Sequence, residues 1–259
     1  MKKYLSSLVL FFIYIALTAC TTYKKNEVNP VLIDSTAGII NINVDANFSG
    51  EALVLDKYFS LNSNDSIKVS LFKFYLTNIK FKNSITGAWV IVPNSYFLFD
   101  QAHASFSSNL IRIPNMPAGE YSEIAFYTGV DSLANTNEVI ANSIPALSPT
   151  NEMIWSWSSG YVFYKLNGMY KNVGQMYDKG PFVYDVGSNA TLAKHDFVFT
   201  KKLVVKAKAT SIVDIHADAA KLFTGTSTID VNTNHDVTAG PATIPLMQNY
   251  SNMYSIVVE

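Results

Sequence analysis

The densest aromatic segment of the sequence is MIWSWSSGYVFYKLNG, residues 153–168. It holds Trp155 and Trp157, two of the three tryptophans of the chain. Residues two positions apart on an extended chain point to the same face, so both indoles are expected on one side. After Gly160, apolar residues occupy both alternating faces, which is typical of a strand in the middle of a sheet. The segment therefore predicts a central strand of a β-protein.

Two interpretations of this segment remain open from the pattern alone. In the first, the strand only builds the hydrophobic core, which is the commoner role of a segment that is apolar on both faces. In the second, the Trp-x-Trp pair beside Ser158, Ser159 and Gly160 is a site at which chemistry takes place.

From Gly38 onward the chain is a succession of short segments in which apolar and polar residues alternate, as they do in β-strands. Ile40, Ile42 and Val44, for example, alternate with polar residues. Turn-forming pairs such as Pro93-Asn94 separate the segments. Strands are expected over residues 40–44, 52–55, 67–81, 89–92, 96–99, 110–113, 120–127, 182–186, 195–200, 203–209, 212–217 and 254–258.

This pattern predicts an all-β fold: a single antiparallel β-sandwich of the Ig-like or Greek-key type, with long loops and one or two short helices. Residues 129–149 form a long polar connection, and connections of this length usually carry function or short helices. A helical turn is expected from Asp218 to Phe223, with Asp218 as its N-cap. No repeat and no shift in composition divides the chain, so residues 38–259 are expected to form one domain.

Residues 1–20 have the features of a lipoprotein signal. Lys2 and Lys3 form a basic n-region, and residues 5–16 are an apolar segment too short for a good membrane span. The segment closes with Leu17-Thr18-Ala19-Cys20, a lipobox in which the cysteine becomes the lipidated N-terminus. We expect a signal peptide over residues 1–19, and a lipidated Cys20 with a flexible tether over residues 20–37. A secretory peptide with an incidental cysteine is the alternative.

Lipidation predicts a chain that works outside the cytoplasm, anchored to the bacterial cell envelope and expected at the outer membrane. Cys20 is the only cysteine, so no thiol remains for disulfides, metal thiolates or catalysis. The formal net charge is −1 and no basic block is present, which argues against nucleic acid as a partner. Charged residues make up 15% and aromatic residues 13% of the chain, a balance that favours a packed globular protein.

No catalytic motif is present. The sequence lacks a Gly-x-Ser-x-Gly elbow, a phosphate loop and a dinucleotide fingerprint, so we expect a protein that is not an enzyme. The histidines His103, His195, His216 and His235 show no spacing that would place two metal ligands on one element. Asp214 and His216 share a face of one expected strand and could bind a metal, but a solvated polar face explains them equally well.

Several segments carry motifs that belong together. The most specific is the Met-x-Trp-x-Trp-x-Ser-Gly-Tyr pattern that begins at Met153. The others are Tyr75 to Ile79, Tyr96 to Asp100, Pro117 to Tyr121 with Phe126, Gly129 to Ser132 with Asn135, Leu147 to Pro149, and Asn249 to Tyr254. Together they resemble the MbnP-like family of extracytoplasmic copper-binding proteins associated with methanobactin operons. The resemblance covers nearly all of the chain after the tether.

The resemblance implies an anchored or secreted, β-rich protein that binds copper. In this family a partner di-haem enzyme, related to MauG and the bacterial cytochrome c peroxidases, can oxidise a tryptophan to kynurenine. Carried over to this chain, the modified residue would be Trp155 or Trp157. Copper(I) in an oxidising compartment accepts imidazole and other soft or borderline ligands, and no cysteine is available here.

The chain also departs from the family pattern at three positions. Asp185 and Asn47 stand where the family leads us to expect histidines, and Asn167 stands in place of a glutamate. Replacing imidazole by carboxylate or amide weakens a copper(I) site and shifts the preference toward harder cations.

Four residues are therefore the candidate metal ligands: Asp185, His216, His235 and Asn47. The departures also support an alternative function, a non-catalytic surface binding module of the same fold that has lost the copper site.

Overall fold

The computed structural model describes residues 36–103, 109–158, 160–238, 240–250 and 252–259. The expected signal peptide, the expected lipidation site at Cys20 and nearly all of the expected tether lie outside the described residues. Residues 34–259 form one compact unit. Within the described part of the chain, no helix is long and apolar enough to cross a membrane.

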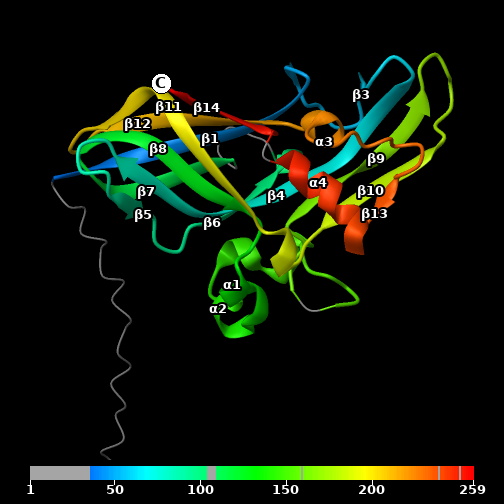
Figure 1. The fold of residues 1–259 in the computed structure, drawn as a ribbon. Coiled ribbons are helices and arrows are strands. Elements are labelled where there is room, and N and C mark those ends of the chain that lie inside the picture. The colour runs from blue at the N-terminus through cyan, green and yellow to red at the C-terminus, as the bar shows by residue number, and fades with distance from the viewer. Residues whose placement is uncertain (1–35, 104–108, 159, 239, 251) are drawn as a thin grey trace, which may run out of the picture. The chain divides into compact units, whose positions relative to one another are not determined.

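Five of the described strands form the first sheet, called sheet A (Figure 1). Strand β1 pairs on one side with β12, in parallel, and on the other with β2 and β7, and β14 completes the sheet beside β12. The strands are β1 (Ala37–Phe48), β2 (Glu51–Ala52), β7 (Leu110–Pro117), β12 (Thr210–Asp218) and β14 (Tyr254–Val258).

Nine of the described strands form sheet B, which is built around the long strand β4 (Asp65–Asn83). Strand β4 pairs with five others, β3, β5, β6, β8 and β9. The further strands are β3 (Tyr58–Ser60), β5 (Trp89–Ile91), β6 (Tyr96–Asp100), β8 (Gly119–Thr128), β9 (Tyr164–Asn172), β10 (Gly180–Val186), β11 (Ala193–Val205) and β13 (Asp236–Val237).

The two sheets enclose one large hydrophobic core, so the predicted all-β sandwich is confirmed. Ile40 and Ile42 of β1 share this core with Phe72 and Phe74 of β4. Most strands pair antiparallel as predicted, but β1 with β12 and β10 with β13 pair in parallel. The parallel arrangement of β12 is possible because the chain reaches it from β11 in sheet B rather than through a hairpin within sheet A.

The connection over residues 129–149 carries short helices, as its length suggested. They are α1 (Ser132–Thr136), α2 (Glu138–Asn142) and the 3-10 turns η2 (Pro145–Leu147) and η3 (Pro149–Asn151), and together we call residues 131–151 the helical cap. Figure 1 shows α1 and α2 outside the two sheets. The described chain has more helical segments than the one or two expected; the others are η1 (Gln101–His103), η4 (Asn189–Thr191), α3 (Lys221–Thr224), η5 (Gly240–Ala242) and α4 (Thr243–Tyr250).

The predicted helical turn after β12 is present but begins later than expected. Helix α3 starts at Lys221, and its N-cap residue is Ala220, which makes no side-chain cap. Asp218 instead accepts hydrogen bonds from the backbone N–H groups of Ser49 and Ala220, at 2.8 and 3.0 Å. Its carboxylate therefore fixes the turn between β1 and β2 as well as the turn that leads into α3.

The helical cap gives sheet B a second hydrophobic core on its outer face. Tyr75 of β4 and Phe163 are buried there, on the side away from the sandwich core. This explains why the sequence around them is apolar on both faces: one face meets sheet A and the other meets the cap. The buried members of the second core are Tyr75, Val130, Ala134, Ala141, Leu147, Met153, Tyr161 and Phe163.

Asp131 fastens the helical cap to sheet B. Its Oδ1 caps α1 by accepting from the backbone N–H groups of Leu133 and Ala134, at 3.1 and 3.3 Å. Its Oδ2 accepts from Asn78 of β4 at 3.1 Å and from the hydroxyl of Tyr96 in β6. Partial burial alone would raise the pKa of Asp131, but these hydrogen bonds outweigh it and hold the pKa below its usual value. One carboxylate thus joins α1, β4 and β6.

The segment that predicted a central strand only partly forms one. Strand β9 begins at Tyr164, between β4 and β10, so the central position is confirmed for its second half. Ile154 forms an isolated antiparallel bridge with Tyr161, and residues 155–158, which follow Ile154, form no strand. The prediction of an extended chain at Trp155 and Trp157 is therefore wrong. Gly160, with a φ of +92°, has a backbone conformation outside the strand region.

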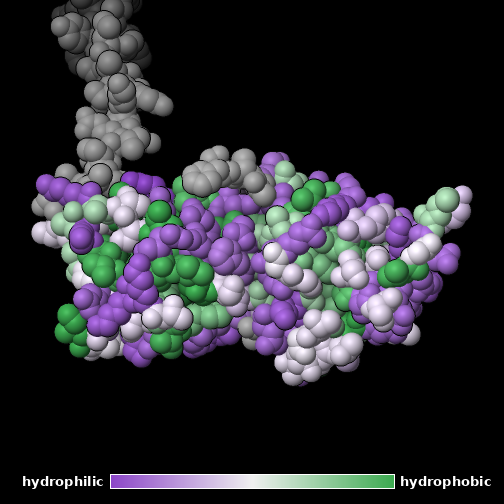
Figure 2. All heavy atoms as spheres, turned by 90° about the horizontal axis from the view of Figure 1, so that it is seen from above, coloured by the Kyte–Doolittle hydropathy of each residue, from purple (hydrophilic) through white to green (hydrophobic). Residues whose placement is uncertain are grey.

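The face of the molecule turned away from α1 and α2 shows no large continuous hydrophobic surface. Figure 2 shows its hydrophobic residues in small groups separated by hydrophilic ones. Scattered apolar side chains of this kind are common on protein surfaces and do not by themselves mark a binding site.

His195 of β11 is a core histidine, only 3% exposed. Its Nε2 lies 3.0 Å from the hydroxyl of Thr128, which also lies 2.7 Å from the hydroxyl of Tyr254. The ring contacts Phe126 at 5.3 Å between centroids. Burial lowers the pKa of His195 to about 4, so the imidazole stays neutral in the folded protein.

Lowering the pH from 6.5 toward 4 is expected to reduce the free energy of unfolding, because the unfolded chain takes up a proton at His195 that the folded chain does not. Stability therefore rises with pH across this window, and the contribution of His195 is at most about 3 kcal/mol. Urea unfolding at several pH values measures it. The variant His195→Gln should show a flatter profile, and an unchanged profile in this variant would contradict the assignment.

Candidate functional site

Trp155 and Trp157 lie in the loop of a short hairpin at the edge of the helical cap. Backbone hydrogen bonds from Trp155 N to Gly160 O, at 3.3 Å, and from Val162 N to Met153 O, at 2.8 Å, close this hairpin. The two indole rings contact each other with centroids 5.0 Å apart and planes tilted by 47°. The two indoles do lie together, as the sequence predicted, but a loop rather than a strand brings them there.

The two tryptophans differ in how they are held. The indole Nε1 of Trp155 donates to the carbonyl of Gly187 at 3.2 Å, which fixes this ring against the end of β10. Trp157 is 66% exposed. The pair therefore combines one anchored indole with one that a partner molecule can reach directly.

Asn135 of α1 holds the hairpin to the cap. Its Oδ1 accepts from the backbone N–H of Tyr161 at 2.8 Å, and its Nδ2 donates to the side chain of Asn189 at 2.9 Å. The hydroxyl of Tyr161 donates to the carbonyl of Leu147 at 2.9 Å, also within the cap. A side chain at Gly160 would collide with Asn135, since a Cβ there would lie 2.8 Å from its Oδ1.

A cavity of about 350 Å³ opens beside the two indoles. Its described lining contains no carboxylate, imidazole or amine. The lining residues are Asn135, Thr136, Trp155, Trp157, Ser158, Tyr161, Gly187, Ser188, Asn189, Thr191, Thr238, Gly240 and Thr243. The cavity offers hydroxyl and amide groups for hydrogen bonding, but no base or acid that titrates near neutral pH.

Two of the four candidate metal ligands lie on sheet A. Asn47 of β1 and His216 of β12 are on the solvent side, where β1 and β12 place Asp45 opposite His216 and Asn47 opposite Asp218. His216 Nδ1 lies 2.8 Å from Asp45 Oδ2, and Asn47 accepts from the backbone N–H of Gly50 at 3.1 Å. Only one imidazole is present in this group.

The other two candidates lie on sheet B. Asp185 of β10 pairs with Lys165 of β9 at 3.5 Å, and both side chains are largely covered. His235 precedes β13, and its ring stacks on Tyr170 with centroids 6.0 Å apart. The structure does not bring the four residues together. Across the described residues, no group of three or more His, Cys, Asp or Glu side chains is arranged to hold a metal ion.

Sequence reasoning missed the residues that position the tryptophan hairpin. Gly187 contributes a backbone carbonyl and close packing, since a Cβ there would lie 2.2 Å from the carbonyl oxygen of Tyr161, and Asn189 contributes one amide contact across the cavity. Neither leaves a signal in composition or periodicity, because both act through contacts between segments far apart in the chain. Asn135 belongs to one of the motifs that resemble the family, but the sequence did not indicate what its side chain does.

The fold and this site define a β-sandwich with a helical cap on one outer face and an exposed tryptophan pair at the edge of that cap. The model of the MbnP family matches residues 37–243. The chain therefore belongs to the MbnP family, and the resemblance seen in the sequence is confirmed.

The solved structure of MbnP from Methylosinus trichosporium is similar to this chain, with a TM-score of 0.55 at 13% identity. The match covers 86% of this chain and 99% of that chain. At this level of identity the likeness shows the shared fold. No curated protein matches the chain.

Replacing Gly160 by alanine is expected to destabilise the protein more than replacing Gly87 by alanine. Both glycines have positive φ angles, +92° and +70°, but only a Cβ at Gly160 meets another group, the amide of Asn135. The additional cost of this collision is about 1–3 kcal/mol. Urea unfolding measures the difference, and tryptophan fluorescence reports the hairpin. Equal losses in the two variants would show that Asn135 does not constrain the hairpin.

Proposed function

We propose that this protein is a lipid-anchored, extracytoplasmic binding protein, not an enzyme, whose tryptophan pair is oxidised by a di-haem partner enzyme. The partly exposed pair of Trp155 and Trp157, whose indole rings contact each other, carries the proposal. It sits in the segment that most closely resembles the MbnP family, at the surface, where a second protein can reach it. The lipobox ending at Cys20 supports the anchor.

The pair suits oxidation by an external enzyme better than oxidation by the chain itself. Opening an indole ring is a four-electron oxidation, and the hydroxyl and amide side chains that line the cavity beside the indoles are not oxidants, so the oxidant has to be supplied by a partner. Trp157 is exposed enough to contact a partner, and its ring contact with Trp155 lets an electron vacancy move between the two indoles. The bond from Trp155 to Gly187 keeps that second ring in place.

The proposed reaction opens one indole ring. The oxidant, a peroxide used by the haem enzyme, accepts the electrons and is reduced to water. Two hydrogen peroxide molecules accept four electrons and four protons and become four water molecules. Two water molecules supply the two oxygen atoms that enter the indole, and its C2–C3 bond breaks to give N-formylkynurenine. Hydrolysis then releases the formyl group as formate and leaves kynurenine. The protein contributes the positioned indole, and the partner contributes the redox chemistry.

Intact and peptide mass spectrometry of the protein treated with its di-haem partner and peroxide tests this proposal. We expect the mass gain of a tryptophan-to-kynurenine conversion on the peptide that contains Trp155 and Trp157. The peptide containing Trp89, the third tryptophan, serves as the internal control. Trp89 lies in β5, where the amine of Lys80 from β4 covers its ring, and it has no indole neighbour among the described residues. An unmodified pair, or equal conversion of Trp89, would contradict the proposal.

The copper that the family resemblance implies does not fit the described residues as a preformed soft site. Asp185 forms an ion pair with Lys165, which balances its charge, and His235 stacks on Tyr170 of the same sheet. His216, backed by Asp45, is the single imidazole on sheet A among the candidates. One imidazole among carboxylates and amides is a poor donor set for copper(I). This favours the second candidate function, a binding module that has lost a tight copper site.

Calorimetric titration of the mature chain with copper(I) is therefore expected to show only weak binding. Any such binding should disappear in His216→Ala, because among the four candidate ligands His216 is the imidazole that a carboxylate orients, as is usual for metal-binding histidines. The variant His103→Ala is the matched control, because His103 also pairs with an aspartate but lies in another part of the molecule. Tight, stoichiometric binding that survives in His216→Ala would overturn this view of the metal chemistry.

A further inference from the structure

A second and larger hollow, about 1030 Å³, lies between β6, β7 and the helical cap. Aliphatic side chains from separate elements converge on it without filling it. Leu98 comes from β6, Leu110 from β7, Leu133 from α1 and Ile140 from α2. These four are partly or largely exposed, and Leu133 is 61% exposed. A concave, mostly apolar hollow of this size is typical of small-molecule sites.

The hollow follows the outer edge of strand β6. Among the described strands, β6 pairs only with β4, through Tyr96 to Asp100. Each of these five β6 residues lines the hollow. Asp131 holds Tyr96 and α1 together at one side, so both walls are fixed by the same carboxylate. The hollow is therefore built into the junction of sheet and cap.

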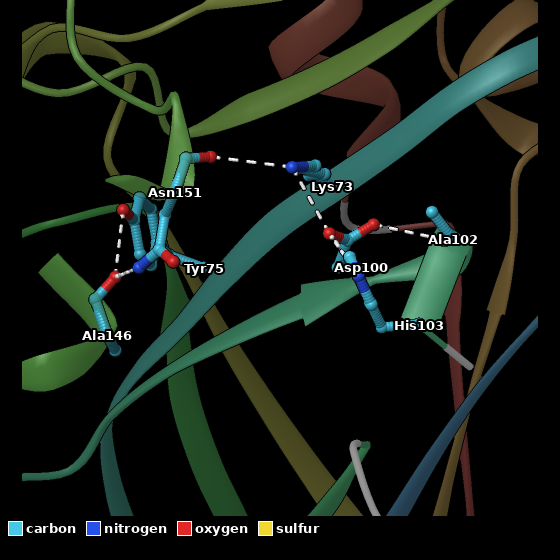
Figure 3. A network of polar contacts seen from close by, with 7 residues as sticks. All are labelled: Lys73, Tyr75, Asp100, Ala102, His103, Ala146 and Asn151. Atoms are coloured by element: carbon cyan, nitrogen blue, oxygen red, sulfur yellow. Dashed lines mark hydrogen bonds and ion pairs between the residues drawn. The ribbon is translucent and has the colours of Figure 1, made fainter. Parts of the chain in front are cut away.

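Polar groups meet at one end of the hollow. Figure 3 shows Lys73 between Asp100 and the carbonyl of Asn151. Lys73 Nζ lies 3.1 Å from Asp100 Oδ2 and 3.4 Å from the carbonyl of Asn151. The same Oδ2 lies 2.9 Å from Nδ1 of His103, while Oδ1 accepts from the backbone N–H of Ala102 at 3.0 Å.

This polar end has one donor left over, on Lys73. Both carboxylate oxygens of Asp100 accept hydrogen bonds. Partial burial alone would raise the pKa of Asp100, but the hydrogen bonds from His103, Lys73 and Ala102 lower it, so the carboxylate stays ionised. Among the described residues, two of the three N–H groups of Lys73 have acceptors. His103 is 75% exposed, and its Nδ1 donates to the Asp100 carboxylate.

The surrounding charges favour an anion at the free N–H of Lys73. Lys165 of β9 stands directly opposite Lys73 in the pairing of β4 with β9. Two lysines in this position repel each other unless negative charge is nearby. Asp100 and Asp185 supply this negative charge. Asp100 pairs with Lys73 and Asp185 pairs with Lys165, so each carboxylate lies on the outer side of the two neighbouring lysines. The region between the two amines carries no carboxylate among the described residues.

We propose that this hollow binds an amphipathic small molecule with a hydrophobic body and a carboxylate head. The body lies against Leu98, Ile140 and Ile144, and the head accepts a hydrogen bond from the remaining N–H of Lys73 Nζ. The apolar walls supply affinity by removing hydrocarbon from water, and the lysine distinguishes a carboxylate from a neutral head. This site is separate from the tryptophan pair and does not depend on its oxidation.

Calorimetric titration with decanoate and with decanol tests the site. The protein is the mature chain with Cys20→Ser, so that no attached acyl chain competes for the hollow. We expect saturable binding of one decanoate per chain, about tenfold tighter than decanol, because only the carboxylate gains a charged hydrogen bond. Lys73→Met should remove this tenfold preference and leave decanol binding unchanged.

Two neighbouring substitutions on α2 locate the ligand. Ile140→Trp fills the hollow and should abolish binding of both compounds. Val139→Trp is the matched control, because Val139 is 82% exposed and does not line the hollow, and it should leave both affinities unchanged. Circular dichroism and thermal unfolding confirm that each variant is folded.

Three results would overturn the proposal. Absence of saturable decanoate binding refutes the site. Binding that persists in folded Ile140→Trp places the ligand elsewhere. Equal decanoate affinity in the unsubstituted chain and in folded Lys73→Met refutes the assignment of the carboxylate head.

Discussion

The position of both candidate sites depends on one carboxylate, that of Asp131. It caps α1 and at the same time accepts hydrogen bonds from Asn78 of β4 and Tyr96 of β6. Through α1 it places Asn135, which holds the tryptophan hairpin, and through Tyr96 it fixes one wall of the larger hollow. A short helix of this kind has little stability of its own, so its place on the sheet has to come from such contacts.

The helical cap also explains why sheet B has two buried faces. An antiparallel sheet in a sandwich usually presents one face to the core and the other to water. Here Tyr75 and Phe163 point away from the sandwich and would be exposed without the cap. Their burial gives the cap a hydrophobic base. The hydroxyl of Tyr75 donates to the carbonyl of Ala146 at 3.2 Å, which adds a hydrogen bond between β4 and the cap (Figure 3).

The family-like motifs meet in this same region of the structure. Tyr75, Tyr96, Asp131, Asn135 and Tyr161 come from four of the quoted segments, yet each contacts the cap or the sheet beneath it. The motifs thus describe how the cap is attached, whereas the candidate metal ligands lie on two separate sheets. This is why membership of the MbnP family and the fold follow from the sequence, while the donor set for copper departs from what the resemblance implied.

The sequence by itself determined the all-β class, most of the strands, the helical content of the long connection and the family, because alternation, turn residues and local motifs are properties of neighbouring positions. It did not determine that Trp155 and Trp157 lie in a loop, since a strand and a hairpin loop share the same local apolar pattern. Only the tertiary structure placed Asp185 beside Lys165 and separated it from His216. Only the tertiary structure assembled the large hollow from β6, β7 and the cap. Such contacts join residues far apart in the chain, and their pairing follows from how the sheets and cap pack.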